Sequence, residues 1–172
     1  VSLGAHFGAA LTFYHVLQPV SDDPDIVLHW AEFPEERRSH ALRELRKVAA
    51  AAGLPEAECV VVAGRAFEEI LRVLSEGGHE VVVMGQPRRD SGFIKGLLGT
   101  TVERVARHSP VPVLVVREDH EPVNQGPRRL VLSTDLSPAS LGAFPWAEAV
   151  SRAYGAGIEL VNVQEPMGLP GT

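Results

Sequence analysis

A glycine-bearing loop between an apolar strand and a short helix carries the residue types that bind phosphate. The run Val81–Met84 shows no polar alternation, which is typical of a parallel strand buried on both faces. Gly85 follows and is predicted to end the strand, because glycine lets the backbone turn or approach a ligand closely. Gly99 and Thr100 precede apolar residues at helical spacing, so Thr100 is predicted to start a helix whose free N–H groups can hold an anion. The order of strand, glycine loop and helix start therefore indicates a phosphate-binding connection.

The composition argues against several classes of protein. The chain has 172 residues, of which 45% are hydrophobic, and a formal net charge of -6. A general nucleic-acid-binding module would need clustered Lys and Arg, and no apolar run approaches the roughly 20 residues of a membrane helix. The single cysteine, Cys59, rules out an internal disulfide framework, and the 7 histidines do not pair at metal-ligand spacing. We expect a cytoplasmic protein without a metal site and without nucleic-acid or membrane partners.

Strands and helices alternate along the sequence, which predicts an α/β fold with a parallel sheet. The predicted strands are Ala10–Leu17, Cys59–Ala63, Val81–Met84, Val111–Val116, Arg129–Ser133 and Ile158–Val163. The predicted helices are Glu35–Ala52, a segment around Phe67–Leu74, the stretch after Thr100, Ala139–Tyr154 and, at the start, the last turns of a helix in Val1–Gly8. Residues 118–127 lose all periodicity and form the predicted linker.

A segment near the start of the sequence is similar to a segment near its end, with Gly, Ala, Val and Pro at four matching positions. Phe7–Pro19 aligns without gaps on Tyr154–Pro166, at an offset of 147 residues (154 minus 7). The alignment places His15 opposite Asn162 and Val16 opposite Val163. An offset of about one small α/β domain indicates that the chain contains parts of two copies of the same unit.

The segment His79–Arg117 resembles the universal stress protein family. In that family a pattern of Gly, two residues, Gly, nine residues and Gly-Ser/Thr lies between the fourth and fifth strands, and the SPVPVLVVR run is similar to the fifth strand. The resemblance implies a doubly wound, Rossmann-like α/β fold of the adenine nucleotide alpha hydrolase-like type. It also implies a mostly parallel five-stranded sheet with the strand order 3-2-1-4-5.

The same resemblance implies a division into domains. Residues 1–117 correspond to one universal stress protein domain that lacks its first strand and most of its first helix. Residues 128–172 correspond to the strand, helix and strand that begin a second domain. Because the first strand is central in the family sheet, one hypothesis is that Arg128–Tyr154, of the same chain or of a neighbouring one, fills its position beside Val81–Met84. The alternative is that residues outside this sequence complete both domains.

The resemblance further implies where a nucleotide binds. In nucleotide-binding members the glycine loop holds the phosphates, an Asp after the first strand contacts the nucleoside, and a Val at the end of the second strand packs on adenine. The candidate residues are Gly85, Arg88, Arg89, Gly99, Thr100, Thr101, Val16, Thr134, Asp135 and Val163. For Asp135 a purely structural role, as a turn or capping residue, is equally open.

The loop departs from the family pattern at its centre. Arg89 stands where the second glycine falls, the loop is one residue longer, and Pro87 has no N–H to donate. Arg88 and Arg89 can contact phosphate through their guanidinium groups or remain solvated surface charges. Both interpretations are open, as is a loop that only connects strand to helix.

We expect a universal stress protein-like module that binds ATP or a related adenine nucleotide, with Mg²⁺ as a companion and no covalent cofactor. Its expected role is stress response or signalling, and pairing is expected through the edge strand 111–117, between chains or between tandem domains. One alternative is a family member that acts through protein contacts without nucleotide. A weak ATPase is the other, although we identify no catalytic residues and therefore expect no enzyme.

Overall fold

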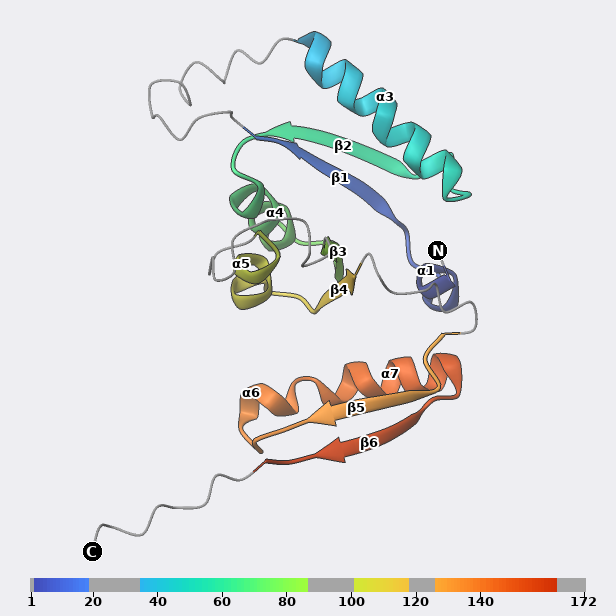
Figure 1. Ribbon diagram of the computed structural model, residues 1–172, viewed down its shortest axis with the longest axis vertical. Helices are drawn as coiled ribbons and strands as arrows, with labels where there is room; N and C mark the ends of the chain where they lie inside the picture. The colour runs from blue at the N-terminus through green and yellow to red at the C-terminus, as the bar shows by residue number, and fades with distance from the viewer. Residues whose placement is uncertain (1, 19–34, 87–100, 118–125, 164–172) are drawn as a thin grey trace, which may run out of the picture. The chain divides into compact units, whose positions relative to one another are not determined.

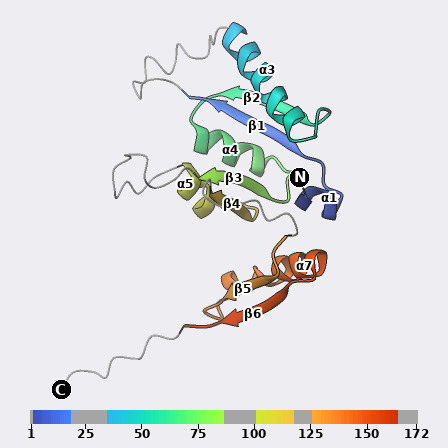
Figure 2. The ribbon, with the colours of Figure 1, turned by 45° about the vertical axis from the view of Figure 1, so that its right-hand side comes forward.

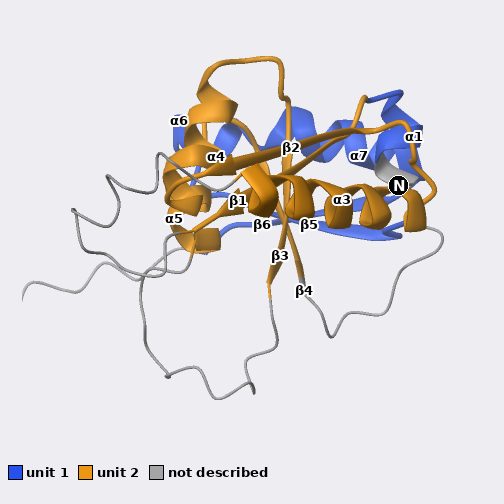
Figure 3. Cartoon of the chain, turned by 90° about the horizontal axis from the view of Figure 1, so that it is seen from above, with its two compact units in different colours: residues 1–9, 122–172 blue, residues 10–121 orange. Residues whose placement is uncertain are grey.

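The computed structural model describes residues 2–18, 35–86, 101–117 and 126–163, in which helices and strands alternate (Figure 1). The chain divides into two compact units, one of residues Ala10–Glu121 and the other of Val1–Ala9 with Pro122–Thr172 (Figure 3). The sequence predicts one domain over residues 1–117, whereas here Val1–Ala9 groups with the later segment. The two units are described separately below.

The larger unit contains two parallel strand pairs. Strand β1 (Thr12–Leu17) pairs with β2 (Glu58–Ala63), and strand β3 (Val82–Gln86) pairs with β4 (Val113–Arg117). Parallel neighbours need a crossover connection, and helix α3 (Glu35–Ala51) lies between β1 and β2 in sequence. It packs along both strands, with Ala49 fully buried (Figures 1 and 2).

Two shorter helices pack against each other in this unit. Helix α4 (Ala66–Ser75) buries Leu74, and helix α5 (Thr101–His108) buries Val105 completely. The guanidinium carbon of Arg104 lies 4.6 Å from the centre of the Phe67 ring, a cation–π contact between the two helices. Helix α5 also contacts both β3 and β4, so it packs beside this strand pair.

The smaller unit is built around a third parallel pair. Strand β5 (Arg129–Ser133) pairs with β6 (Gly157–Val161), and helix α1 (Ser2–Phe7) contributes a ring contact between His6 and Tyr154, with centroids 4.5 Å apart. Helices α6 (Pro138–Leu141) and α7 (Phe144–Tyr154) connect the strands. The predicted single helix over Ala139–Tyr154 is thus wrong. Pro145, in the first turn of α7, has no N–H to continue a helix and favours a new start.

The α/β class with parallel strand pairing is confirmed, while the order 3-2-1-4-5 stays a prediction. The described strands form three separate pairs, and the pairs β1–β2 and β3–β4 agree with the two outer pairs of that order. In the smaller unit β5 pairs with β6. The hypothesis that Arg128–Tyr154 places a strand beside Val81–Met84 stays a prediction.

Strand β3 differs from its prediction in two respects. It continues through Gly85 to Gln86, because Gly85 still pairs with Val116 of the neighbouring strand. It is also covered on one face only in the described part of the chain: Val83 is 53% exposed, between the half-buried Val82 and Met84.

Candidate functional site

The turn that follows β5 is the most closely bonded of the predicted site segments. Thr134 is buried, and its hydroxyl oxygen accepts the backbone N–H of Leu136 at 2.9 Å. The same hydroxyl lies 2.8 Å from the hydroxyl of Ser140 in helix α6. Short hydroxyl side chains compete with the backbone for such bonds and so favour turns over regular structure. Thr134 thereby fixes the chain where it leaves the strand.

Asp135 closes the turn with its side chain. Its Oδ1 atom accepts the backbone N–H of Ser137 at 2.9 Å, while the carboxylate is exposed to solvent. Hydrogen bonds from the Ser137 side chain and backbone, and then from Ser140, lower the pKa of Asp135 from 3.8 to about 2. The group is consequently an anion at neutral pH, and an ionised carboxylate accepts hydrogen bonds without donating any.

Helix α6 takes its cap from Ser137. The hydroxyl oxygen of Ser137 accepts the backbone N–H of Ser140 at 3.2 Å, and Pro138 occupies the first turn. The predicted structural role of Asp135 is therefore confirmed for the turn, whereas the cap belongs to Ser137. Leu136, between them, has a φ of 65°, a left-handed conformation that is rare for a residue with a side chain.

The end of β6 is bonded to this turn. The backbone N–H of Thr134 donates to the carbonyl of Val161 at 2.9 Å, and Nδ2 of Asn162 donates to the carbonyl of Thr134 at 2.7 Å. Val163 follows directly and is 78% exposed. The structure therefore brings Thr134 and Asp135 to the carboxyl end of the same strand pair that leads to Val163.

The remaining described candidates lie in the larger unit. Val16 is half-buried one residue before the end of β1, Gly85 lies in β3, and Thr101 is the first residue of α5. A Cβ added at Gly85 would meet no described atom within 4 Å, so there is room beside this backbone position. The other loop candidates, Arg88, Arg89, Gly99 and Thr100, lie outside the described residues.

The predicted residues thus form two sets in two units, and the structure does not join them into one site. Sequence reasoning missed Ser140, which completes the turn, and Asn162, which holds it. The hydroxyl-rich run after β5 was a signal for Ser140. The signal for Asn162 was its place opposite His15 in the internal repeat.

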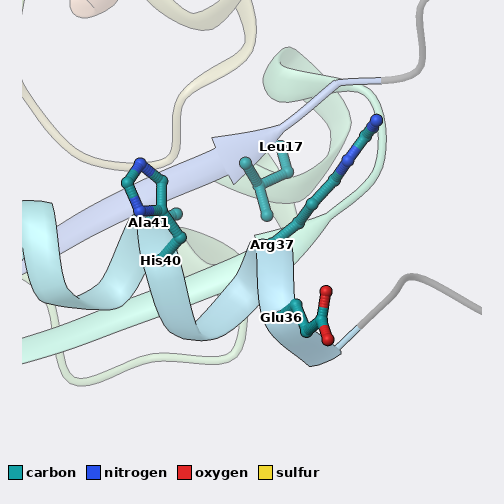
Figure 4. Close-up of a pocket in the computed structure, with 5 residues that line it drawn as sticks. All are labelled: Leu17, Glu36, Arg37, His40 and Ala41. Atoms are coloured by element: carbon teal, nitrogen blue, oxygen red, sulfur yellow. The ribbon is translucent and has the colours of Figure 1, made fainter.

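A shallow hollow of about 340 Å³ lies in the larger unit and contains no predicted site residue. It is formed by Leu17 at the end of β1 and by the first turns of α3 (Figure 4). The helix residues that line it are Glu36, Arg37, His40 and Ala41. Its place next to Val16 puts it beside the carboxyl end of β1.

Metal-ligand clusters and membrane-spanning helices are both absent from the described ranges. No group of three or more His, Cys, Asp or Glu side chains there is arranged to hold a metal ion. No helix in those ranges is both long and apolar enough to cross a membrane.

Comparison with known proteins places the fold and the family. A curated relative, "Universal stress protein in QAH/OAS sulfhydrylase 3'region" from Thermus aquaticus, is 33% identical over 115 residues, which are 64% of this chain and 79% of the relative.

Solved structures with a similar fold include two universal stress proteins. The structure from Archaeoglobus fulgidus is 24% identical to this chain, with a TM-score of 0.64. The match covers 95% of this chain but only 60% of that one. The structure of universal stress protein UspA from Lactobacillus plantarum is 20% identical, with a TM-score of 0.47 over 67% of this chain and 90% of its own. The universal stress protein family profile matches residues 1–117, and the chain therefore belongs to that family.

Proposed function

We propose that this chain is a nucleotide-binding module that takes ATP or a related adenine nucleotide in a stress-response or signalling role. The observation that carries the proposal is the turn at Asp135, which presents an exposed carboxylate, ionised at neutral pH, at the carboxyl end of a parallel strand pair. Open α/β sheets bind ligands at that end of their strands. A carboxylate there can accept hydrogen bonds from ribose hydroxyls or from an amino group of the base.

In the larger unit, phosphate binding is assigned to the glycine loop, separately from the turn at Asp135. A Cβ added at Gly85 would meet no described atom within 4 Å, and Thr101 begins an eight-residue helix that contacts β3 and β4. In the sequence, Arg88 and Arg89 add guanidinium groups, and Gly99 and Thr100 lead into the helix. Mg²⁺ would accompany the phosphates of ATP.

Calorimetric titration of the intact chain with ATP tests the proposal. We expect micromolar binding to the larger unit that is lost in Gly99→Val, where a branched side chain blocks the backbone from the phosphates. Asp135→Ala removes the carboxylate of the smaller unit and should weaken binding to that unit about tenfold, the effect of one hydrogen bond to a charged group. Arg152→Ala is the matched control, because Arg152 forms only an exposed pair with Glu148 on helix α7. A folded wild type that binds nothing at millimolar ATP would refute the proposal.

Contacts with proteins are a second candidate function, favoured by the exposure of β4. Leu114, Val115 and Val116 are each between about a third and a half exposed along this strand. Consecutive apolar residues on an open strand favour pairing with another chain or another domain. A weak ATPase is the remaining alternative, and release of ADP from ATP in the presence of Mg²⁺ would support that function.

A further inference from the structure

The bonds that hold the turn at Asp135 come from both strands of the smaller unit. The last residue pair of the ladder is Ser133 with Val161, and the N–H of Thr134 adds one backbone bond to Val161 beyond it. The 2.7 Å bond from Nδ2 of Asn162 to the carbonyl of Thr134 links the ends of the two strands one residue further along, and a side chain makes it.

Asn162 therefore forms its hydrogen bond with Thr134, the residue whose side chain holds the rest of the turn. The Thr134 hydroxyl, which accepts from Leu136 and meets Ser140, belongs to the residue whose carbonyl Asn162 holds. The turn needs such a restraint, because Leu136 is in a left-handed conformation, with a φ of 65°, that is unfavourable for a residue with a side chain. Strain of this kind persists only where the surrounding bonds over-determine the backbone.

We propose that Asn162 is a positioning residue for the nucleoside: its side-chain amide fixes the carbonyl of Thr134 and so aims the Asp135 carboxylate at the ligand. This inference rests on the proposed nucleotide function and adds to it a residue that contacts no nucleotide itself. The strand ladder of β5 and β6 does not depend on the Asn162 side chain, so its loss disorders the turn without unfolding the unit.

The internal repeat supplies a conservative replacement. His15 stands opposite Asn162 in the alignment of the two copies. A histidine ring has an N–H donor in both its neutral and its charged form, so Asn162→His keeps the donor that the carbonyl of Thr134 needs. Asn162→Leu has a similar volume but no donor. The pair of variants therefore separates the hydrogen bond from the space that the side chain fills.

The experiment measures three properties of the wild type, Asn162→Leu and Asn162→His in the full chain. These are amide hydrogen exchange at Leu136 and Ser137, the pKa of Asp135 by NMR, and the dissociation constant of ATP. In Asn162→Leu we expect exchange at both amides to be at least tenfold faster and the pKa to return toward 3.8. We also expect ATP to bind about tenfold more weakly, as for the loss of one positioning hydrogen bond, and Asn162→His to restore all three.

The outcomes separate this inference from the proposed function. Unchanged exchange and an unchanged pKa in Asn162→Leu would overturn the positioning role, even if the wild type binds ATP. Equal ATP affinity of Asn162→Leu and wild type would overturn it as well. A wild type that binds no ATP would refute the nucleotide function and, with it, the ligand part of this inference, while the exchange and pKa data would still decide whether Asn162 holds the turn.

Discussion

The ring of Tyr154 fills the space in which residue 126 would carry a side chain. A Cβ added at Gly126 would collide with the Cδ1, Cε1 and Cγ atoms of that ring, and Gly126 has a φ of 73°. We predict that Gly126→Ala lowers the free energy of unfolding by about 2–4 kcal/mol, since overpacking adds to the cost of a left-handed alanine. Urea denaturation followed by the fluorescence of Trp146, in helix α7, measures this loss.

Gly155→Ala is the matched control for that prediction. Gly155 ends helix α7 with a φ of 64°, but a Cβ there would meet no described atom within 4 Å. It should therefore cost only the backbone term, about 1–2 kcal/mol. Equal losses at the two glycines would show that the Tyr154 ring does not constrain residue 126.

The stability of the smaller unit should depend on the ionisation of Asp135. Its pKa is lowered from 3.8 to about 2 in the folded chain, so its stabilising contribution is complete above pH 4 and is lost as the pH falls toward 2. Asp135→Asn keeps an oxygen for the N–H of Ser137 but does not titrate. We expect the urea midpoint of the wild type to fall more steeply than that of Asp135→Asn between pH 4 and pH 2. Parallel curves would contradict this assignment.

Leu136 should be replaceable with a gain in stability. The side chain is 63% exposed and contributes little packing, whereas its φ of 65° is unfavourable for leucine. Asparagine tolerates this conformation, so we expect Leu136→Asn to raise the free energy of unfolding by about 0.5–1 kcal/mol. A β-branched residue tolerates it least, and Leu136→Val should lower the same quantity by about 1 kcal/mol. Thermal unfolding of the two variants checks the order, and the reverse order would exclude strain at residue 136.

The exposed strand β4 should mediate self-association. We predict that the wild type sediments as a dimer and that Val115→Lys weakens the dimer at least tenfold, because a charge on an open edge prevents strand pairing. Val48→Lys, on a valine of helix α3 that is more exposed (57% against 37% for Val115), is the control and should leave sedimentation unchanged. A monomeric wild type at all accessible concentrations would remove this candidate interface.

The sequence predicted most strands because their signal is local. Apolar runs such as Cys59–Ala63 and Arg129–Ser133 are short, are bounded by turn residues and coincide with β2 and β5 within one residue. The single helix predicted over Ala139–Tyr154 failed because periodicity continues through Gly142 while Pro145 restarts the helix. The end of β3 was misplaced because glycine permits a turn but does not require one, and Gly85 keeps its ladder partner.

Site residues could be predicted from the sequence only where their own position and residue type indicate the role, without knowledge of how the strands pair. Asp135 was found because the family resemblance places an Asp after this strand, and the turn confirms its structural role. Asn162 was not found, because its function depends on a carbonyl 28 positions away in sequence that only the folded strand pair brings within 2.7 Å. The pairing of strands is a non-local property, and it decides which polar side chains share one end of a sheet.

The most direct test of nucleotide binding is an amide NMR titration of the isotope-labelled intact chain with ATP. The account predicts saturable, micromolar shifts within each unit: at Gly85 and Thr101 in the larger unit, and at Asp135 and Ser137 in the smaller one. Amides of the exposed face of α3, such as that of Lys47, should not move and provide the internal reference. An absence of shifts at millimolar ATP, or shifts confined to residues remote from the carboxyl ends of the strands, would contradict the account.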